Sequence, residues 1–302
     1  MSPRKLLYIM SPSYSGSTLL TRLLACHPEL ATVGELKATS LGDIEAYRCS
    51  CGDKLLECPF WNAVKADVEA QGGRMDLREW RTRFETDSAL VNRIMMPLVR
   101  GPGFEAMRSL AFSIVPGARA SLDEILLHNA QVIEAVCRLQ QGSVFLDESK
   151  DPLRLKYFLQ SGRWDIYVVR LIRDGRGTVN SDRRHNGLAV RESAANWCRK
   201  VEEMDRVAAL MPASHLMDVA YEDLCNETER TLGAIAEFVG VDGAPGAFDD
   251  RPEQHIIGND MRLGALSEVV LDEKWRTAMS TDDLAEFAAV AGSLNQRLGY
   301  GG

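Results

Sequence analysis

Short apolar runs alternate with longer amphipathic stretches along most of the chain. Runs of strand length cover residues 5–10, 31–33, 143–146, 165–172 and 214–219, and most of them precede a stretch with helical spacing. Short buried strands that alternate with helices are typical of βα units, in which helices cover both faces of a parallel sheet. We therefore predict an α/β fold with a parallel sheet flanked by helices.

The stretch between the second and third predicted strands has a different pattern. Residues 60–141 are mainly helical in their spacing and carry scattered aromatic and methionine side chains. Most of these side chains suit a helix-packing core, and a few suit the lining of a pocket. Because the chain is long enough for one α/β core with an inserted lobe, we expect a single domain over residues 1–302 with residues 60–141 as a helical insertion.

The last helix is marked at both ends. Ser280 and Asp283 have the spacing of a capping box, and Gly299 follows the last turn as a stop signal. Apolar residues at 284, 287, 288, 291, 294 and 298 form one stripe between these ends. We expect this helix to be structural.

Charge and composition narrow the class of protein. The 302 residues have a net charge of -8 and a pI near 5.3, which argues against nucleic acid as the main partner. The apolar run at residues 5–10 is too short for a signal sequence, and no later run is long enough to span a membrane. We therefore expect a soluble, cytoplasmic protein. Seven cysteines, an odd number over a long chain, do not indicate a disulfide framework.

Residues 6–28 combine a strand, a small polar loop and an amphipathic helix. Gly16 allows a tight turn, so that successive backbone N–H groups and the helix N-terminus can converge on an anion, with the hydroxyls of Ser17 and Thr18 as further donors. A nucleotide-binding loop of the Walker type would have a lysine where Ser17 stands. Taken alone, the segment fits an ordinary helix-capping turn as well as it fits a phosphate site.

A second candidate anion site follows the fourth predicted strand. Arg173 comes directly after this strand, and Ser181 lies on the helix that follows. Arginine at the carboxyl end of a strand can hold an anion through charge-assisted hydrogen bonds, and ligands of parallel sheets usually bind at this edge.

Several short motifs, in their order and spacing, resemble the sulfotransferases that depend on 3'-phosphoadenosine 5'-phosphosulfate (PAPS). They are SGSTLL at residues 15–20, HP at 27–28, GE at 34–35, KDP at 150–152, RDGR at 173–176 with Ser181, and YEDL at 221–224. The chain is similar in particular to the tyrosylprotein and bacterial-type branches. The resemblance extends from residue 6 to about residue 275, with a poor match in the helical lobe. It implies a P-loop-like sheet and an insertion that forms the acceptor side.

The resemblance also implies which residues bind the donor. Those around the 5'-phosphosulfate are Tyr14, Ser15, Gly16, Ser17 and Thr18, and those around the 3'-phosphate are Arg173, Ser181 and Arg184. Further candidate contacts to the nucleotide are Tyr221, Asn259, Arg262 and Lys274, although Lys274 suits a plain surface role equally well.

Two residues are candidates for the chemistry itself. Lys150 matches the lysine of the family that stabilises the leaving group, and Glu35 is the best candidate for the base that removes the acceptor proton. A solvated helix-start lysine and an exposed loop glutamate are the alternatives. His27 and His255 are weaker candidates for the base.

The loop departs from its relatives in one respect. Relatives often have a basic residue directly before Ser-Gly, but this chain has Tyr14 at that position. Tyrosine can donate a hydrogen bond but adds no positive charge, so Lys150 or an arginine from elsewhere would have to supply more of the charge stabilisation.

Three cysteines, at positions 49, 51 and 58, lie close together. A structural zinc site needs four ligands, and no second Cys pair or Cys/His pair follows at the usual spacing. We therefore expect no metal, and instead buried thiols or a strained disulfide between two of the three.

These features together predict an enzyme that transfers the sulfuryl group of PAPS to a hydroxyl of a small-molecule acceptor. Its product would be adenosine 3',5'-bisphosphate. The alternatives are a small-molecule kinase of the same fold and a catalytically silent nucleotide-binding module. The identity of the acceptor stays open, and so does a homodimer.

Overall fold

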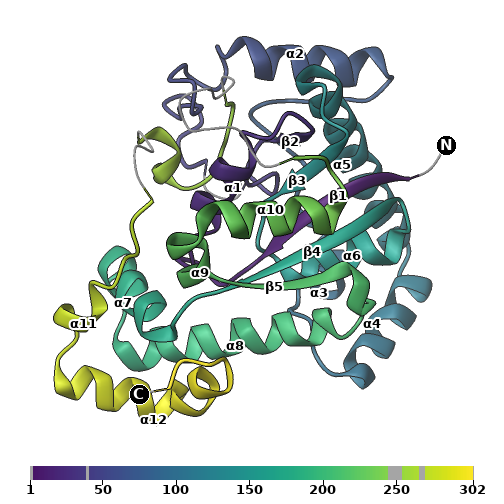
Figure 1. Cartoon of the computed structure of the whole chain (residues 1–302). Coiled ribbons are helices and arrows are strands. Elements are labelled where there is room, and N and C mark those ends of the chain that lie inside the picture. Colours follow the sequence, from purple (N-terminus) through teal and green to yellow (C-terminus); the bar gives the residue numbers. More distant parts are fainter. Residues whose placement is uncertain (1–2, 39–40, 244–253, 265–268, 302) are drawn as a thin grey trace.

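The computed structural model of the chain contains a central parallel β-sheet (Figure 1). Within residues 3–38, 41–243, 254–264 and 269–301, which the structure describes, the sheet has five strands in the order β2-β3-β1-β4-β5. The strands are β1 (Arg4–Met10), β2 (Leu30–Thr32), β3 (Val144–Asp147), β4 (Trp164–Ile172) and β5 (Leu216–Ala220). All pairs of neighbouring strands are parallel. The predicted α/β fold and the predicted strands are confirmed, with bounds that differ by one or two residues.

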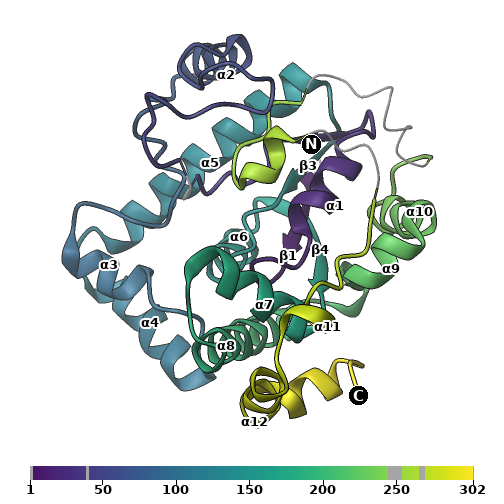
Figure 2. The ribbon, with the colours of Figure 1, turned by 90° about the vertical axis from the view of Figure 1, so that its left-hand side faces the viewer.

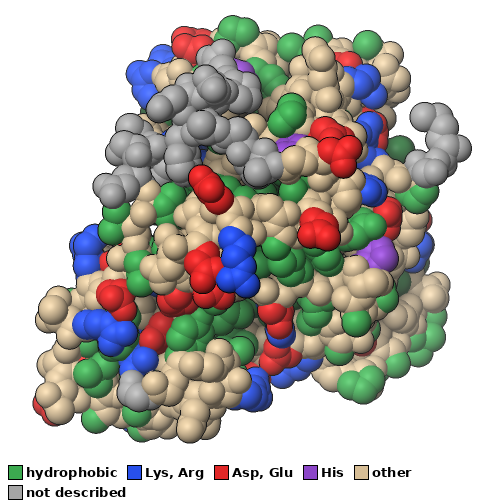
Figure 3. Space-filling view, viewed as in Figure 1, with side chains coloured by type: hydrophobic (Ala, Val, Ile, Leu, Met, Phe, Trp, Pro, Cys, Tyr) green, Lys and Arg blue, Asp and Glu red, His purple; other side chains and the backbone are tan. Residues whose placement is uncertain are grey.

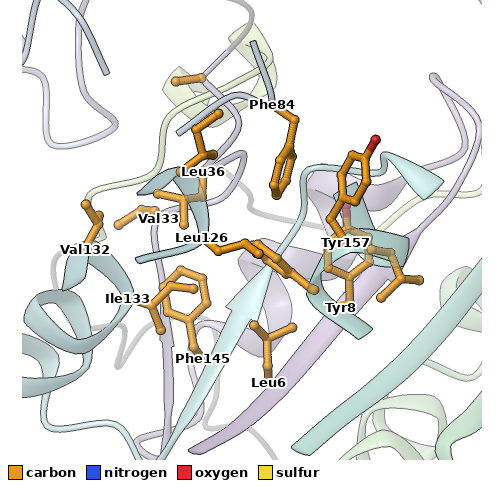
Figure 4. Packing of buried hydrophobic residues seen from close by; sticks show 14 of the residues in the cluster. Leu6, Tyr8, Val33, Leu36, Phe84, Leu126, Val132, Ile133, Phe145 and Tyr157 are labelled. Carbon is orange, nitrogen blue, oxygen red and sulfur yellow. The ribbon is translucent and has the colours of Figure 1, made fainter. Parts of the chain in front are cut away.

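Alternate residues of the central strand β1 face two different hydrophobic cores. Leu6 and Tyr8 join the core that includes residues of α5 (Ala118–Gln140) and α6 (Pro152–Ser161) (Figure 4). Leu7 and Ile9 join the core formed with α1 (Ser17–Leu24), α9 (Tyr221–Asn226) and α10 (Thr228–Val239). Since side chains of a strand alternate between the faces of a sheet, a strand that is apolar throughout must be covered on both sides.

Between β2 and β3 the described residues form α2 (Pro59–Ala70), α3 (Ala89–Met95), α4 (Pro102–Ile114) and α5. The helical pattern predicted for this stretch is wrong for residues 71–88, which contain no helix. The physical reason is that this segment is held by side chains of its neighbours: the Thr82 carbonyl accepts hydrogen bonds from Arg154 and Asn129.

Arg154 connects this segment to the sheet. Its guanidinium donates to the carboxylate of Asp147 at the end of β3, to the Thr82 carbonyl and to Asn129 Oδ1 of α5. The side chains of Arg154 and Asp147 are fully buried. A buried ion pair that also satisfies further hydrogen-bonding groups fixes the relative positions of the elements it joins.

A further layer packs at one edge of the sheet. It contains α7 (Gly175–Asn186), α8 (Val190–Ala208), α11 (Trp275–Ala278) and α12 (Thr281–Arg297), with a core that includes Trp197, Trp275 and Phe287. The predicted capping box is confirmed: Ser280 and Asp283 bond each other's backbone N–H groups at the start of α12. Figure 2 shows α12 next to α8 in this layer. Because α1 follows β1 and α7 follows the neighbouring strand β4, both helices begin at the carboxyl end of the sheet. Two short 3₁₀ helices, η1 (Ala213–His215) and η3 (Asp260–Leu263), complete the described elements.

Candidate active site at the carboxyl end of the sheet

A cavity of about 1140 Å³ lies beyond the carboxyl ends of β1, β2 and β3. The segments that directly follow these strands supply Ser11, Tyr14, Glu35 and Lys150 to its lining. The opposite side comes from the 83–85 segment, from residues 96 and 98 after α3, and from residues 258–261. Of the residues predicted from the sequence, this cavity therefore brings together Tyr14, Glu35, Lys150 and Asn259.

The loop between β1 and α1 has the backbone that the sequence predicted. Gly16 caps α1 in the left-handed region, with φ of 88°. A Cβ at this position would lie 2.4 Å from the ring of Tyr221, so only glycine allows this ring to pack against the loop. Tyr14 also has a positive φ, of 63°, which is unusual for a side chain of this size.

The buried hydroxyl groups of this region differ in whether they have a hydrogen-bond partner. The side-chain oxygens of Ser11 and Ser15 have no hydrogen-bond partner among the described residues. Thr18, in the first turn of α1, donates to Glu148 Oε1 at 2.7 Å. Because a buried polar group without a partner is costly, Ser11 and Ser15 are groups that a ligand at the loop could satisfy after a small rearrangement.

Lys150 lies between two carboxylates at the floor of the cavity. Its Nζ is 2.5 Å from Glu35 Oε1 and 3.4 Å from Glu148 Oε1. Glu35 follows β2 and Glu148 follows β3, and a hydrogen bond from the Glu148 N–H to the Gly34 carbonyl joins the two segments. Lys150 has a positive φ of 60°, so its backbone is strained at the point where it enters the cavity.

The two carboxylates control the charge of Lys150. Burial alone would lower the pKa of Lys150, but the negative charges of Glu148 and Glu35 outweigh burial and raise it. Burial raises the pKa of Glu148, although the positive charge of Lys150 opposes this effect. Lys150 therefore remains protonated at neutral pH.

Glu148 is the member of this group that sequence reasoning missed. Its side chain is almost fully buried, and it connects Lys150 to Thr18 of α1. A signal was present in the sequence, because Glu148 is an acidic residue directly after a buried strand and two positions before Lys150. The residue type pointed away from this role, because an acidic side chain disfavours an anion bound nearby.

Arg173 lies against the loop between β1 and α1. Its Nη1 donates to the Tyr14 carbonyl at 3.1 Å, its Nη2 donates to the Asp272 carbonyl, and its guanidinium stacks over the Tyr221 ring at 4.6 Å. Gly177 leaves room for this side chain, because a Cβ there would lie 2.8 Å from Arg173 Nε. The structure thus brings Arg173, Tyr221 and the loop together, although 159 residues separate Arg173 from Tyr14.

Ser181 and Arg184 lie farther along α7. Ser181 is half-buried and Arg184 is exposed. The next residue of α7, His185, stacks on the Tyr14 ring with centroids 5.0 Å apart, and Asn186 donates to the Tyr14 hydroxyl. These contacts place Tyr14 between the cavity and α7.

The three candidates near the C-terminus have different environments. Asn259 lines the cavity and caps η3. Arg262 is buried, and its guanidinium donates to the backbone carbonyls of Arg48 and Gly258. Lys274 is exposed at the start of α11. The contacts of Arg262 show that it anchors the 258–262 segment.

The two histidines considered as alternative bases lie outside the cavity lining. His27 is buried and its ring contacts the Asp242 carbonyl and the Glu29 N–H. His255 lies beside the cysteine cluster. Of the three candidates for the base, Glu35 is the one that lines the cavity.

The cysteine cluster requires a correction. Cys49, Cys51 and Cys58 form no disulfide with one another, so the predicted alternative of a strained disulfide is wrong for this structure. The sequence places only three potential ligands close together, but in the structure His255 joins Cys49, Cys51 and Cys58 as a fourth potential ligand. A spacing argument could not find it, because 197 residues separate Cys58 from His255.

Charge is mixed over the surface. On the face drawn in Figure 3, basic side chains lie scattered among acidic ones. Among the described residues, no helix combines the length and the apolar character needed to cross a membrane.

Comparison with known proteins places these observations in context. Residues 118–245 match the model of the sulfotransferase family. The fold is similar to that of the sulfotransferase domain of the Synechococcus PCC 7002 olefin synthase (TM-score 0.52, 18% identity, 97% of this chain and 95% of that chain covered). It is also similar to the sulfotransferase domain from the curacin biosynthetic pathway (TM-score 0.52, 16% identity, 97% and 98% covered).

A search of curated protein sequences found no significant match. The likeness to the tyrosylprotein branch stays a prediction. The matched segment contains β3, β4 and Arg173, and the sheet that these strands belong to is the one the two solved domains share. The family match over residues 118–245 and the shared fold together support a sulfotransferase enzyme.

Proposed function

We propose that this enzyme transfers the sulfuryl group of PAPS to a hydroxyl of a small-molecule acceptor and releases adenosine 3',5'-bisphosphate. The observation that carries the proposal is the contact of 2.5 Å between Lys150 and Glu35 inside the cavity. It puts a donor that is charged at neutral pH and a carboxylate at one point, next to the N-terminus of α1. Transfer of a charged group needs these two kinds of residue together.

The loop at the start of α1 fits the phosphosulfate end of the donor. Backbone N–H groups at a helix N-terminus favour an anion, and the unpartnered hydroxyls of Ser11 and Ser15 add donors. The residues proposed to hold this end are Tyr14, Ser15, Gly16, Ser17 and Thr18. A kinase would need a lysine in place of Ser17 to reach a γ-phosphate.

Arg173 is proposed to hold the 3'-phosphate. Its present partners are the Tyr14 carbonyl and Asp272, so the guanidinium would exchange a contact with Asp272 for one with the phosphate. Ser181 and Arg184 on α7 would add contacts to the phosphate. Tyr221 would support the Arg173 guanidinium, which stacks on its ring. Asn259, Arg262 and Lys274 are proposed to act on the nucleotide from the C-terminal segments, with Arg262 acting through its anchoring of Gly258.

The proposed reaction is an in-line displacement at sulfur. Glu35 accepts the proton of the acceptor hydroxyl, whose oxygen forms the new bond to sulfur. The bond between sulfur and the bridging oxygen of the donor breaks, and its electron pair stays on that oxygen. Lys150 donates a hydrogen bond to this oxygen, where negative charge develops.

The raised pKa of Lys150 indicates how it acts. A lysine that holds its proton above its ordinary pKa of 10.5 stabilises charge but gives up a proton reluctantly. We therefore assign Lys150 to electrostatic stabilisation of the leaving group. In the absence of the donor, its contact with Glu35 keeps both groups in place.

The insertion is proposed to form the acceptor side of this single domain. Phe84, Met96 and Leu98 give the cavity an apolar wall, while Arg83 and Glu85 add polar groups. A cavity of about 1140 Å³ with such a lining suits a small organic molecule that has an apolar body and a reactive hydroxyl.

Calorimetric titration tests the donor assignment. We expect adenosine 3',5'-bisphosphate to bind more tightly than ATP, and tighter binding of ATP would overturn the assignment. Replacing Arg173 with alanine should lower the affinity for adenosine 3',5'-bisphosphate by roughly 10- to 100-fold, because a hydrogen-bonded charge is lost. The exposed Arg163→Ala variant is the matched control and should bind as the wild type does.

Transfer of ³⁵S from labelled PAPS to a panel of phenols and alcohols tests catalysis. A labelled product would distinguish the enzyme from a catalytically silent nucleotide-binding module. Tight nucleotide binding with no labelled product from any acceptor class would favour the silent module.

A further inference from the structure

We propose that Cys49, Cys51, Cys58 and His255 form a structural site for one Zn²⁺ ion. The ligand atoms of these four residues all lie within 4.8 Å of one another. The site lies outside the residues that match the family model, and it does not depend on the proposed reaction.

Three of the six distances between the ligand atoms match those of a tetrahedral zinc site. Cys51 Sγ and Cys58 Sγ are 3.7 Å apart, and His255 Nδ1 is 3.5 Å from Cys58 Sγ and 3.7 Å from Cys49 Sγ. Zn–S bonds of about 2.3 Å and Zn–N bonds of about 2.0–2.1 Å at tetrahedral angles separate the ligand atoms by about 3.5–3.8 Å. The three separations therefore leave room for one ion at the centre.

The chemistry of the ligands favours zinc. Three thiols and one imidazole are soft or intermediate ligands, which suit Zn²⁺ and do not suit Mg²⁺ or Ca²⁺. The small span of the ligand atoms encloses one ion and is too small for the thiolates around a cluster of several irons. With four protein ligands no position stays open for substrate, so the ion would be structural.

The second layer of contacts supports this geometry. Phe60, which lies at the start of α2 two positions after Cys58, stacks on the His255 ring at 4.3 Å with an interplanar angle of 3°. This stacking fixes the plane of the imidazole so that Nδ1 faces the three sulfur atoms. Orientation of a histidine ligand by its neighbours is a common feature of metal sites.

The segments joined by the site have little regular structure of their own. Residues 49–58 form turns with one isolated β-bridge, from Arg48 to Lys54, and residues 254–256 are extended. Ser50 connects the two segments, because its N–H donates to the Ile256 carbonyl and its hydroxyl donates to the Gln254 carbonyl. A metal ion stabilises such loops because its binding energy contributes directly to folding.

A zinc ion at this site would affect the cavity through backbone hydrogen bonds near Glu35. The Ile257 N–H donates to the Val33 carbonyl, and the Glu35 N–H donates to the Ile257 carbonyl. Gly258 comes so close to Glu35 that a Cβ would lie 2.9 Å from Glu35 Cγ. Zinc at His255 would thus hold the segment that positions Glu35 and one side of the cavity.

Elemental analysis of the wild-type protein tests the proposal. We expect about one zinc per chain after purification from zinc-supplemented medium in the presence of a reductant. X-ray absorption should show three sulfur ligands and one nitrogen ligand. Replacement of zinc by Co²⁺ should give the absorption of a tetrahedral thiolate complex.

Variants locate the ion. His255→Ala and Cys58→Ser should each lose most of the zinc and lower the melting temperature. The control variants Cys198→Ala and His215→Ala replace half-buried residues far from the cluster in sequence and should retain about one zinc.

The wild-type measurements decide the question even if a variant fails to fold. Folded wild-type protein with negligible zinc, and without the cobalt–thiolate spectrum after reconstitution, would overturn the proposal. A disulfide between Cys51 and Cys58 in the protein purified under non-oxidising conditions would overturn it as well, because a disulfide sulfur cannot serve as a thiolate ligand.

Discussion

The two walls of the cavity are built in different ways. On one wall, Tyr14, Glu35 and Lys150 follow three neighbouring strands whose residues are almost all buried. On the other wall, the 83–85 and 258–261 segments contain little regular structure and are held by side chains that bond backbone carbonyls. Arg154 holds the first of these segments at Thr82, and Arg262 holds the second at Gly258.

This difference separates two tasks. A strand end gives a reactive group a fixed position, because parallel strands and their hydrogen bonds resist movement. Loops that are anchored at a few points can change sequence and shape without disturbing the sheet. The arrangement fits an enzyme whose reaction is constant and whose acceptor is set by the loop wall.

The largest effect on turnover is expected for Lys150, on the wall that the strand ends form. Lys150→Ala should lower turnover by roughly 10³-fold, about 4 kcal/mol, since it removes the charge at the leaving oxygen. Binding of adenosine 3',5'-bisphosphate, measured by calorimetry, should remain close to that of the wild type. Lys65→Ala is the control, because Lys65 forms an exposed pair with Glu69 on α2. Unchanged turnover in Lys150→Ala would remove Lys150 from the chemistry.

An effect of similar size, on the stability of the protein, is expected for Arg154, which holds the wall formed by loops. Arg154→Ala should lower the free energy of unfolding by about 3–5 kcal/mol, because it leaves the buried Asp147 carboxylate without its partner. Urea denaturation measures this change. The exposed pair between Arg191 and Glu286 provides the control, and Arg191→Ala should change stability little. A loss in Arg154→Ala no larger than that of the control would show that the network does not hold the wall.

Glu35→Gln tests the proposed base. Turnover should fall by about 10²-fold, since the amide cannot accept the acceptor proton. The nucleotide affinity should stay the same, because Glu35 is assigned to the acceptor. Glu69→Gln on the surface of α2 is the matched control. If Glu35→Gln retained full turnover, the base would have to be sought elsewhere in the cavity.

The smallest effect is expected for Glu148→Gln, which keeps an oxygen that can accept from Thr18 but removes the charge next to Lys150. The raised pKa of Lys150 puts its loss of charge above pH 10.5 in the wild type, so its stabilising effect is fully present below that pH. Without the charge of Glu148 the pKa of Lys150 should fall.

The readout for Glu148→Gln is the pH profile of turnover. Its alkaline limb should move to lower pH, while turnover near neutral pH falls by roughly tenfold or less. A merely structural role would lower activity at all pH values and leave the shape of the profile unchanged. That second outcome would contradict the positioning role of Glu148.

Local patterns were sufficient for most of the sheet. The predicted strands, the glycine turn at Gly16 and the capping box at Ser280 were readable because each depends on residues close together in sequence. The helical pattern failed at residues 71–88, where hydrogen bonds from Arg154 and Asn129 replace those of a helix. Such tertiary contacts leave no periodic trace in the segment itself.

The candidate site was predictable only in part. The resemblance pointed to Glu35 and Lys150 separately, and the structure brought them within 2.5 Å across 115 residues of sequence. Glu148 was missed because a buried acidic group near a phosphate loop runs against expectation from charge alone. Arg262 carried the right charge for a ligand contact, but its donors are directed to backbone carbonyls.

By itself, the sequence determined the α/β sheet and the glycine turn before α1, because periodicity and glycine are local properties, and the order of its short motifs pointed to the sulfotransferases. Only the tertiary structure decided which groups meet: Lys150 with Glu35, Arg173 with the loop, and His255 with three cysteines. The physical reason is that these contacts join segments that chain folding brings together across more than a hundred residues. Their geometry therefore depends on the packing of the whole sheet and not on any one segment.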